Sequence, residues 1–241
     1  MIMISQGNRE QNIVRIDVKQ VPYQIMEAVN VLRGNIQLSG YKLKVIAVTS
    51  ANSNEGKSTI SFQLAKSLAM LDKRTLYIDC DIRNSMFKLR CNIVLKTQGL
   101  SEFLAGNIGM RDIVYKIENE PYLDVIFAGA KAPNPSELLS AEIFGQMLNY
   151  AREHYDYVIV DTPPVNAVID GVLAAKCCDG TVLVVESKAT ERAQAVRAQR
   201  KLEYAGVKVL GAVLNKARKG QSKYSYGYGY GKKKIHKMGS E

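Results

Sequence analysis

Three segments of the sequence contain the residue types that bind phosphate groups and divalent cations. The first is Gly56–Thr59, which reads Gly-Lys-Ser-Thr; the second contains Asp79 and Asp81; the third starts at Asp161. A glycine-containing loop that precedes a lysine and a hydroxyl residue can surround phosphate with backbone N–H groups, neutralise its charge and supply an oxygen ligand to Mg²⁺. Together the three segments predict a nucleotide site.

The loop before the first of these segments departs from the strict phosphate-binding motif. That motif has glycine five residues before Gly56, where this chain has Ala51. Asn54 lies where the loop can require positive φ, which asparagine tolerates better than most residues. Gly-Lys-Ser-Thr alone is frequent by chance, so its position between a strand and a helix carries the prediction. The predicted ATP-binding residues of the loop are Asn54, Glu55, Gly56, Lys57, Ser58 and Thr59.

The acidic residues supply the rest of the predicted chemistry. Asp161 ends an apolar run and could hold Mg²⁺ directly or through water; the alternative is a strand-end aspartate that caps a turn. Asp79 and Asp81 lie on the same side of the chain, where they could share Mg²⁺ or accept a proton from an incoming hydroxyl. The alternative is a solvated turn in which Arg83 pairs with one acid. The predicted catalytic residues are Lys57, Asp79, Asp81 and Asp161, and the predicted Mg²⁺ ligands are Ser58, Asp79 and Asp161.

Apolar runs and amphipathic segments alternate along most of the chain. The expected strands are Val45–Thr49, Leu76–Asp79, Leu123–Phe127, Tyr157–Asp161, Thr181–Val185 and Val207–Leu214. The expected helices are Ile25–Leu38, Ser58–Leu71, Ser136–His154 and Glu191–Tyr204. This order predicts an α/β fold with a mostly parallel β-sheet flanked by helices on both faces. Ligands of such folds bind at the carboxyl ends of the strands, where all three polar segments lie.

Composition limits the remaining possibilities. The chain has 241 residues, of which 46% are hydrophobic, and we expect one domain at residues 23–216 between an extension, 1–22, and a tail, 217–241. The sequence contains neither a membrane span nor a signal peptide, so we expect a cytoplasmic location. The spacing of the four cysteines fits reduced thiols and does not fit a zinc site.

The excess of positive charge is concentrated in the tail. The formal net charge is +10, and residues 216–241 hold eight Lys or Arg against one acidic residue. This distribution favours an anionic surface or polyphosphate as a partner as readily as DNA, and we expect no nucleic acid. The tail also holds Tyr224, Tyr226, Tyr228 and Tyr230 between small residues, a pattern that predicts flexibility with exposed hydroxyls.

These motifs resemble those of the bacterial tyrosine kinases (BY-kinases) of capsule and exopolysaccharide synthesis, a branch of the P-loop ATPases that includes MinD and ParA. The matching segments are Gly56–Thr59, Leu76–Arg83, Asp161–Pro164, Pro133–Leu139 and Leu214–Lys216, followed by the tyrosine cluster. The resemblance implies a P-loop fold, ATP and Mg²⁺ as cofactors, and a protein-tyrosine kinase. It also implies that the kinase autophosphorylates the four tail tyrosines in trans and regulates polysaccharide synthesis and export.

The resemblance further implies partners and a place for two other motifs. Asn215 would lie near the adenine, and Glu27 and Arg33 would join subunits of a homo-oligomer through Glu-x-x-Arg-x-x-Arg, in which this chain has Asn30 for the first arginine. A separate membrane-spanning activator would recruit the kinase to the inner face of the membrane, and a cognate tyrosine phosphatase would reverse the reaction. Asn84 and Ser85 replace the usual Lys-Pro.

Two other functions fit part of the same pattern. One is a MinD/ParA-like ATPase switch on membrane or DNA, which the absence of lysine from residues 51–55 disfavours. The other is a nucleotide-binding scaffold without catalysis, which Ala51 and Asn54 would suggest. Tyrosine phosphorylation in the tail separates the kinase from both.

Overall fold

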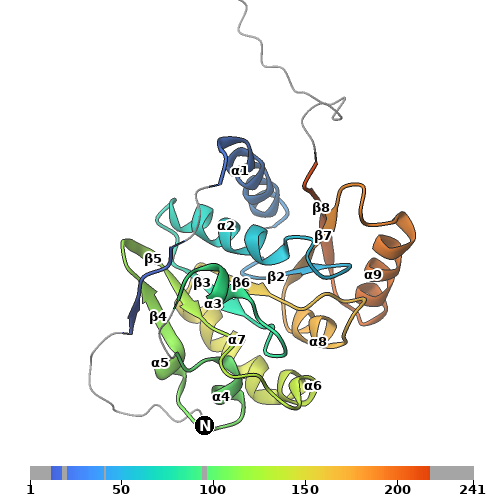
Figure 1. Cartoon of the computed structure of the whole chain (residues 1–241). Helices are drawn as coiled ribbons and strands as arrows, with labels where there is room; N and C mark the ends of the chain where they lie inside the picture. Colours follow the sequence, from blue (N-terminus) through green and yellow to red (C-terminus); the bar gives the residue numbers. More distant parts are fainter. Residues whose placement is uncertain (1–11, 18–20, 41, 94–96, 218–241) are drawn as a thin grey trace, which may run out of the picture.

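A single mixed sheet forms the centre of the molecule. The computed structural model describes residues 12–17, 21–40, 42–93 and 97–217 (Figure 1). The strands are β1 (Ile13–Val14), β2 (Val45–Ser50), β3 (Thr75–Asp79), β4 (Val114–Ile117), β5 (Glu120–Ile126), β6 (Tyr157–Asp161), β7 (Gly180–Glu186) and β8 (Val209–Asn215). Their order across the sheet is β1-β4-β5-β3-β6-β2-β7-β8, and every neighbouring pair is parallel except β4 and β5. The predicted fold class is confirmed.

The central strands are apolar on both faces because helices cover both faces. Every residue of β2 and β3 is buried. The register aligns Asp79 of β3 with Asp161 of β6, and Asp161 with Val48 of β2. Strand register therefore brings the ends of three strands together at one edge of the sheet, although their residues are far apart in the sequence.

Helices cover the sheet in two layers, as Figure 1 shows. The helices are α1 (Tyr23–Leu38), α2 (Lys57–Ala69), α3 (Phe87–Arg90), α4 (Leu100–Leu104), α5 (Met110–Ile113), α6 (Pro135–Ser140), α7 (Glu142–His154), α8 (Asp170–Lys176) and α9 (Arg192–Tyr204). Apolar residues of α1, α2 and α3 pack on one face, and those of α4 to α7 pack on the other. A third cluster joins α8 and α9 to β2 and β7.

Most of the expected elements are present, with differences at short or irregular segments. The segment expected as one helix from Ser136 to His154 is two helices, because Ala141 has the extended values φ −69° and ψ 147°. Strands β1 and β4 and helices α3, α4, α5 and α8 were not expected. In the described part of the chain no helix has the length and apolar character needed to cross a membrane. All four cysteines are described and free.

Candidate functional site

The loop between β2 and α2 has the conformation of a phosphate-binding loop. Gly56 precedes the first residue of α2 and has φ +91°, and Asn54 has φ 65°. A Cβ atom on Gly56 would lie 2.2 Å from Nδ2 of Asn215, so glycine is required here for space as well as for backbone conformation. Among the described residues, the positive-φ positions include Asn54 and Gly56 but not Ala51, which is fully buried. The alanine therefore does not strain the loop.

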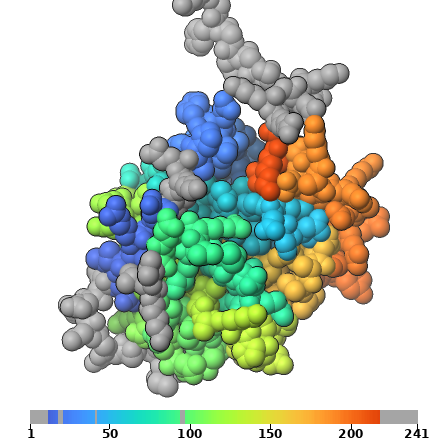
Figure 2. Space-filling model, viewed as in Figure 1, coloured from blue at the N-terminus to red at the C-terminus, as the bar shows by residue number. Residues whose placement is uncertain are grey.

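A small polar cavity lies between this loop and the segment that follows β3. Its volume is about 110 Å³. Its lining includes Asn54, Gly56, Lys57 and Ser58 on one side and Asp79, Asp81, Asn84, Ser85, Met86 and Arg90 on the other. Figure 2 shows the loop in light blue beside the green residues that follow β3. Pockets for whole small-molecule ligands are usually several times larger, so this cavity fits the phosphate end of a nucleotide.

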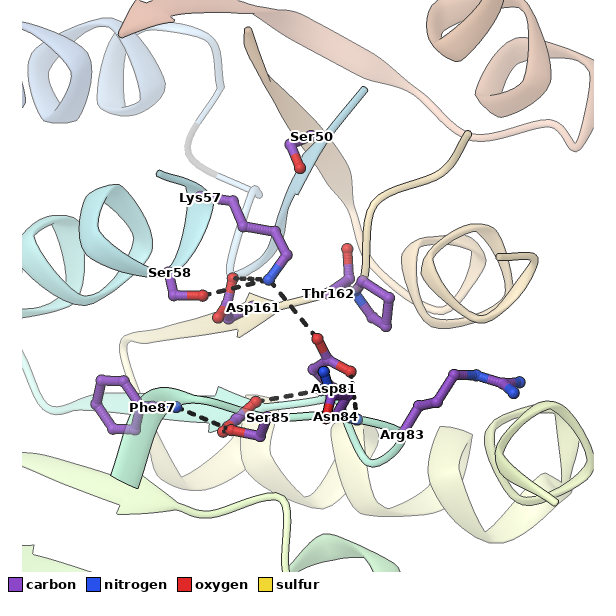
Figure 3. Close-up of polar contacts among 12 residues, drawn as sticks. Ser50, Lys57, Ser58, Asp81, Arg83, Asn84, Ser85, Phe87, Asp161 and Thr162 are labelled. Carbon is purple, nitrogen blue, oxygen red and sulfur yellow. Dashed lines mark hydrogen bonds and ion pairs between the residues drawn. The ribbon is translucent and has the colours of Figure 1, made fainter. Parts of the chain in front are cut away.

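The side chain of Lys57 joins two of the predicted acids. Its Nζ lies 3.9 Å from Oδ2 of Asp81, 3.9 Å from Oδ1 of Asp161 and 3.2 Å from Oγ of Ser58 (Figure 3). Only 13% of the Lys57 side chain is exposed. An ammonium group that is partly buried between carboxylates has donors left for phosphate oxygens, as a P-loop lysine requires.

One carboxylate oxygen of Asp161 accepts a hydrogen bond, and the other does not. The hydroxyl of Tyr77 donates to Oδ2 at 3.2 Å, and burial, the largest effect, raises the pKa of Tyr77 so that it remains a donor. Oδ1 is buried and makes no hydrogen bond, although Lys57 lies 3.9 Å away. Burial also raises the pKa of Asp161, with Lys57 opposing that shift. A buried oxygen without a hydrogen bond is unfavourable, and a cation or its water ligands would satisfy it.

Asp79 is buried beside Asp161 and is held at both carboxylate oxygens. Ser85 Oγ donates to Oδ2, and the backbone N–H of Asp81 donates to Oδ1 at 3.2 Å. Burial, followed by repulsion from Asp161, raises the pKa of Asp79 to about 7. Asp81 is more exposed and accepts a hydrogen bond from the backbone N–H of Asn84 at 3.0 Å.

The side chain of Glu55 stabilises the conformation of the loop. The residue is 3% exposed, and its carboxylate accepts hydrogen bonds from Asn52 N at 2.9 Å and from Thr190 Oγ1. The predicted contribution of Glu55 to nucleotide binding therefore rests on its backbone. Thr59, on the first turn of α2, lines an adjacent cavity with Phe87 and Cys91.

Residues at the end of β8 bind the backbone oxygens of the loop. Asn215 Nδ2 donates to the backbone oxygen of Glu55 at 2.8 Å. Lys216 Nζ donates to the backbone oxygen of Asn54 at 2.8 Å and lies 2.7 Å from Oε2 of Glu186. The structure thus places Asn215 against the loop, and its position near the adenine stays a prediction.

Arg83 does not pair with Asp79 or Asp81. Its Nε lies 2.9 Å from Oδ2 of the fully buried Asp170, and Figure 3 shows its side chain pointing away from Lys57. Ser136 Oγ donates to Oδ1 of the same carboxylate at 2.6 Å. The alternative in which Arg83 neutralises one acid of a solvated turn is therefore wrong, because Arg83 pairs with Asp170 and with neither acid of that turn.

Comparisons with known proteins agree with this geometry. A family described as an AAA domain matches residues 43–191. Tyrosine-protein kinase CpsD of Streptococcus agalactiae is 39% identical over 198 residues, which cover 82% of this chain and 86% of CpsD. The chain belongs to the bacterial tyrosine kinase family. The kinase domain of Escherichia coli tyrosine kinase ETK superposes on this bacterial tyrosine kinase with a TM-score of 0.74 and 31% identity, covering 92% of this chain and 88% of that domain.

A more distant structure shows the same fold. The septum site-determining protein MinD of Pyrococcus horikoshii, solved with Mg-ADP, has a TM-score of 0.62 and 19% identity over 75% of this chain and 72% of MinD. At this identity the similarity concerns the fold alone. The predicted resemblance to bacterial tyrosine kinases and the predicted P-loop fold are confirmed.

The residues predicted for a subunit interface interact within the chain in this bacterial tyrosine kinase. Arg33 Nη1 donates to both the backbone oxygen and Oγ of Ser67, each at 2.7 Å. Ser67 Oγ donates to Asn30 Oδ1 at 2.9 Å, and Asn30 Nδ2 donates to Glu27 Oε1 at 3.3 Å. The bonds of Arg33 and Asn30 to Ser67 fasten α1 to α2. The role of Glu27 and Arg33 between subunits stays a prediction.

Other predicted residues lie outside the described residues, and some residues that contact the site were not predicted. The tail tyrosines Tyr224, Tyr226, Tyr228 and Tyr230 belong to the first group. Tyr77, Ser85 and Asp170 belong to the second. A tyrosine within an apolar strand, two residues before Asp79, was the one sequence signal for Tyr77, whereas Asp170 reaches Arg83 only through tertiary structure.

Proposed function

We propose that this chain is an ATP-dependent protein-tyrosine kinase that phosphorylates the tail of a second copy. The residues phosphorylated are Tyr224, Tyr226, Tyr228 and Tyr230. This autophosphorylation regulates the synthesis and export of capsular or extracellular polysaccharide. The observation that supports this most is the placement of Lys57 between Asp81 and Asp161 at the end of a cavity sized for phosphate. The family membership given above supports the enzyme class.

The residues that line the cavity fit the phosphate groups and the metal ion of MgATP. When bound, MgATP supplies the phosphoryl group and a metal ion whose charge offsets that of the phosphates. Lys57 and the backbone N–H groups of the loop would hold the phosphates, and Ser58 and Asp161 would hold Mg²⁺ together with Asp79. In the described residues no group of three or more His, Cys, Asp and Glu could hold a metal ion by itself. This agrees with Mg²⁺, which is commonly held by one or two carboxylates and phosphate oxygens.

Asp79 is the residue we assign to proton transfer from the incoming phenol. In the metal-free protein burial raises the pKa of Asp79 to about 7, which makes this carboxylate a stronger base than an ordinary aspartate. Asp81 lies two residues away and pairs with Lys57, so it supports the charge balance of the cavity. The hydrogen bond that Tyr77 donates keeps Asp161 oriented.

The partners follow as proposals from the same family resemblance. A separate membrane-spanning protein would activate the kinase and hold it at the inner face of the membrane. A tyrosine phosphatase would remove the phosphate, and copies of this chain would form the oligomer in which one tail reaches another site. We also propose that the kinase domain is residues 23–216, between the extension, 1–22, and the tail, 217–241. Strand β1 lies within the extension and pairs with β4 as part of the sheet.

Phosphate transfer between two marked copies tests the proposal. One copy carries Lys57→Met with an intact tail, and the other is active with phenylalanine at positions 224, 226, 228 and 230. Incubation with Mg-ATP and the activator fragment should place phosphate on the tail of the Lys57→Met copy, as mass spectrometry would detect. The matched control is Lys73→Met, a change of an exposed lysine in the β2–β3 connection, which should retain activity.

Two results would contradict the proposal. Nucleotide binding without phosphate on any tail tyrosine, with the activator present, would favour a scaffold. ATP hydrolysis that DNA or liposomes stimulate, again without phosphotyrosine, would favour an ATPase switch.

A further inference from the structure

The turn that follows β3 contains a serine that contacts a predicted catalytic acid. Ser85 Oγ donates to Oδ2 of Asp79, and the backbone N–H of Phe87 donates to Ser85 Oγ at 3.1 Å. A serine hydroxyl has one hydrogen and two acceptor positions. Because Phe87 occupies an acceptor position, the single hydrogen is directed to Asp79.

The residues behind this serine are fixed by aromatic packing. The ring of Phe87 lies 4.7 Å from that of Tyr77 and 5.2 Å from that of Phe62, measured between centroids. Tyr77 in turn donates to Asp161. One buried aromatic cluster therefore supports both Asp79, through Ser85, and Asp161, through Tyr77.

The serine also lines the reaction cavity. Ser85, Asp79, Lys57 and Ser58 all border the cavity of about 110 Å³. The other oxygen of Asp79 accepts the N–H of Asp81 from the same turn. With one donor on each oxygen, the carboxylate plane of Asp79 has one preferred orientation relative to Lys57. Removal of the Ser85 hydroxyl would leave that plane free to rotate about the remaining bond.

We propose that Ser85 is a positioning residue for phosphoryl transfer, whose hydroxyl holds the Asp79 carboxylate in the orientation that faces the phosphate cavity. This inference rests on the proposed function, since it assigns the effect of Ser85 to the step in which Asp79 acts. Displacement of a catalytic group by about 1 Å can slow a reaction by two orders of magnitude, so a loosened carboxylate should have a measurable effect.

Steady-state kinetics of four variants test the proposal. Ser85→Ala should lower kcat by about tenfold, while KM for ATP stays within about twofold, because loss of a group that acts only in the transition state lowers kcat selectively. Ser85→Thr, which restores a hydroxyl, should recover most of kcat. Ser85→Cys keeps the side-chain volume but has only a weak hydrogen-bond donor. It therefore tests the loss of the hydrogen bond if alanine disturbs folding. Ser140→Ala, an exposed serine on α6, is the matched control.

A double mutant shows whether Ser85 acts through Asp79. In an Asp79→Asn background, Ser85→Ala should cause no further loss, because coupled residues are not additive. Unchanged kcat in Ser85→Ala, failure of threonine to rescue, or additive losses in the double mutant would each overturn the proposal. If wild type hydrolyses ATP but transfers no phosphate to tyrosine, the proposed function fails, and the same comparisons on the hydrolysis rate still decide the role of Ser85.

Discussion

Arg83 and Asp170 form a two-point contact across 87 positions of the sequence, with Nε to Oδ2 at 2.9 Å and Nη2 to Oδ1 at 3.3 Å. This contact ties the turn after β3 to the beginning of α8. It also turns the one arginine of that turn away from Asp79 and Asp81. The acids of the cavity are therefore not paired with Arg83, because a third acid, Asp170, binds its guanidinium group.

Removal of Arg83 should destabilise the fold. Asp170 is fully buried, so Arg83→Gln leaves a buried carboxylate with Ser136 as its remaining side-chain partner, and the free energy of unfolding should fall by about 3 kcal/mol. Urea denaturation measures this change. Lys66→Gln is the control, because Lys66 pairs with Glu120 near the surface and should contribute less than about 1 kcal/mol. Equal losses in the two variants would show that Asp170 does not depend on Arg83.

Substitution of Gly56 should disable nucleotide binding. In Gly56→Ala the new Cβ would meet Asn215 Nδ2 at 2.2 Å and the residue would have to keep φ +91°. The loop must shift, and we expect the affinity for ADP to fall by at least about tenfold, which corresponds to 1.4 kcal/mol. Titration with a fluorescent nucleotide measures it. Gly145→Ala in α7 has open space at its Cβ and should leave the affinity unchanged.

Stability should depend on pH through Asp79. The pKa of Asp79 is raised from 3.8 to about 7, chiefly by burial, so between these values the folded protein keeps a proton that the unfolded chain has lost. In nucleotide-free protein the free energy of unfolding should therefore fall as pH rises from about 4 to about 7, by up to about 1.4 kcal/mol per pH unit from this group. Asp79→Asn should remove that contribution, as denaturation at a series of pH values would show.

A matched variant separates this effect from the other carboxyl groups. Asp72→Asn changes an exposed aspartate in the connection before β3 and should leave the pH profile as in wild type. If Asp79→Asn keeps the wild-type slope, Asp79 is not the group responsible.

Loss of Arg33 should weaken the attachment of α1. Arg33→Met removes the two hydrogen bonds to Ser67, and the free energy of unfolding should fall by about 2 kcal/mol, since hydrogen bonds from charged groups are stronger than neutral ones. Thermal unfolding and sedimentation of the same samples measure stability and subunit association together. If the variant dissociates into monomers of unchanged stability, Arg33 acts at a subunit interface and not in the attachment of α1.

The site acids were predictable because each ends an apolar strand, and strands of a parallel sheet present their carboxyl ends at one edge. Asp79 and Asp161 could be assigned on that basis and Lys57 from the Gly-Lys-Ser-Thr motif, and the structure brings them together. The partner of Arg83 could not be predicted, because Asp170 belongs to no motif and reaches Arg83 only through the packing of α8. Ser85 departs from the family pattern, but its hydrogen bond to Asp79 depends on the fold of a turn that sequence periodicity does not describe.

The short elements escaped prediction for a different reason. Strand β1 has two residues and β4 has four, too few for an alternation pattern to be distinguished from chance. Ala141 separates α6 from α7 by adopting an extended conformation, although alanine is the strongest helix former. Tertiary packing overrides local preference at that position.

The location of the cavity at one edge of the sheet has a practical consequence for probes. The connections at the opposite edge include the turns at Asp72 and Gly206, both with positive φ, which lead into β3 and β8. A fluorophore or affinity handle attached there would be separated from Lys57 by the length of a strand. Such labels would allow copies of the chain to be followed, counted or immobilised while nucleotide chemistry proceeds at the other end.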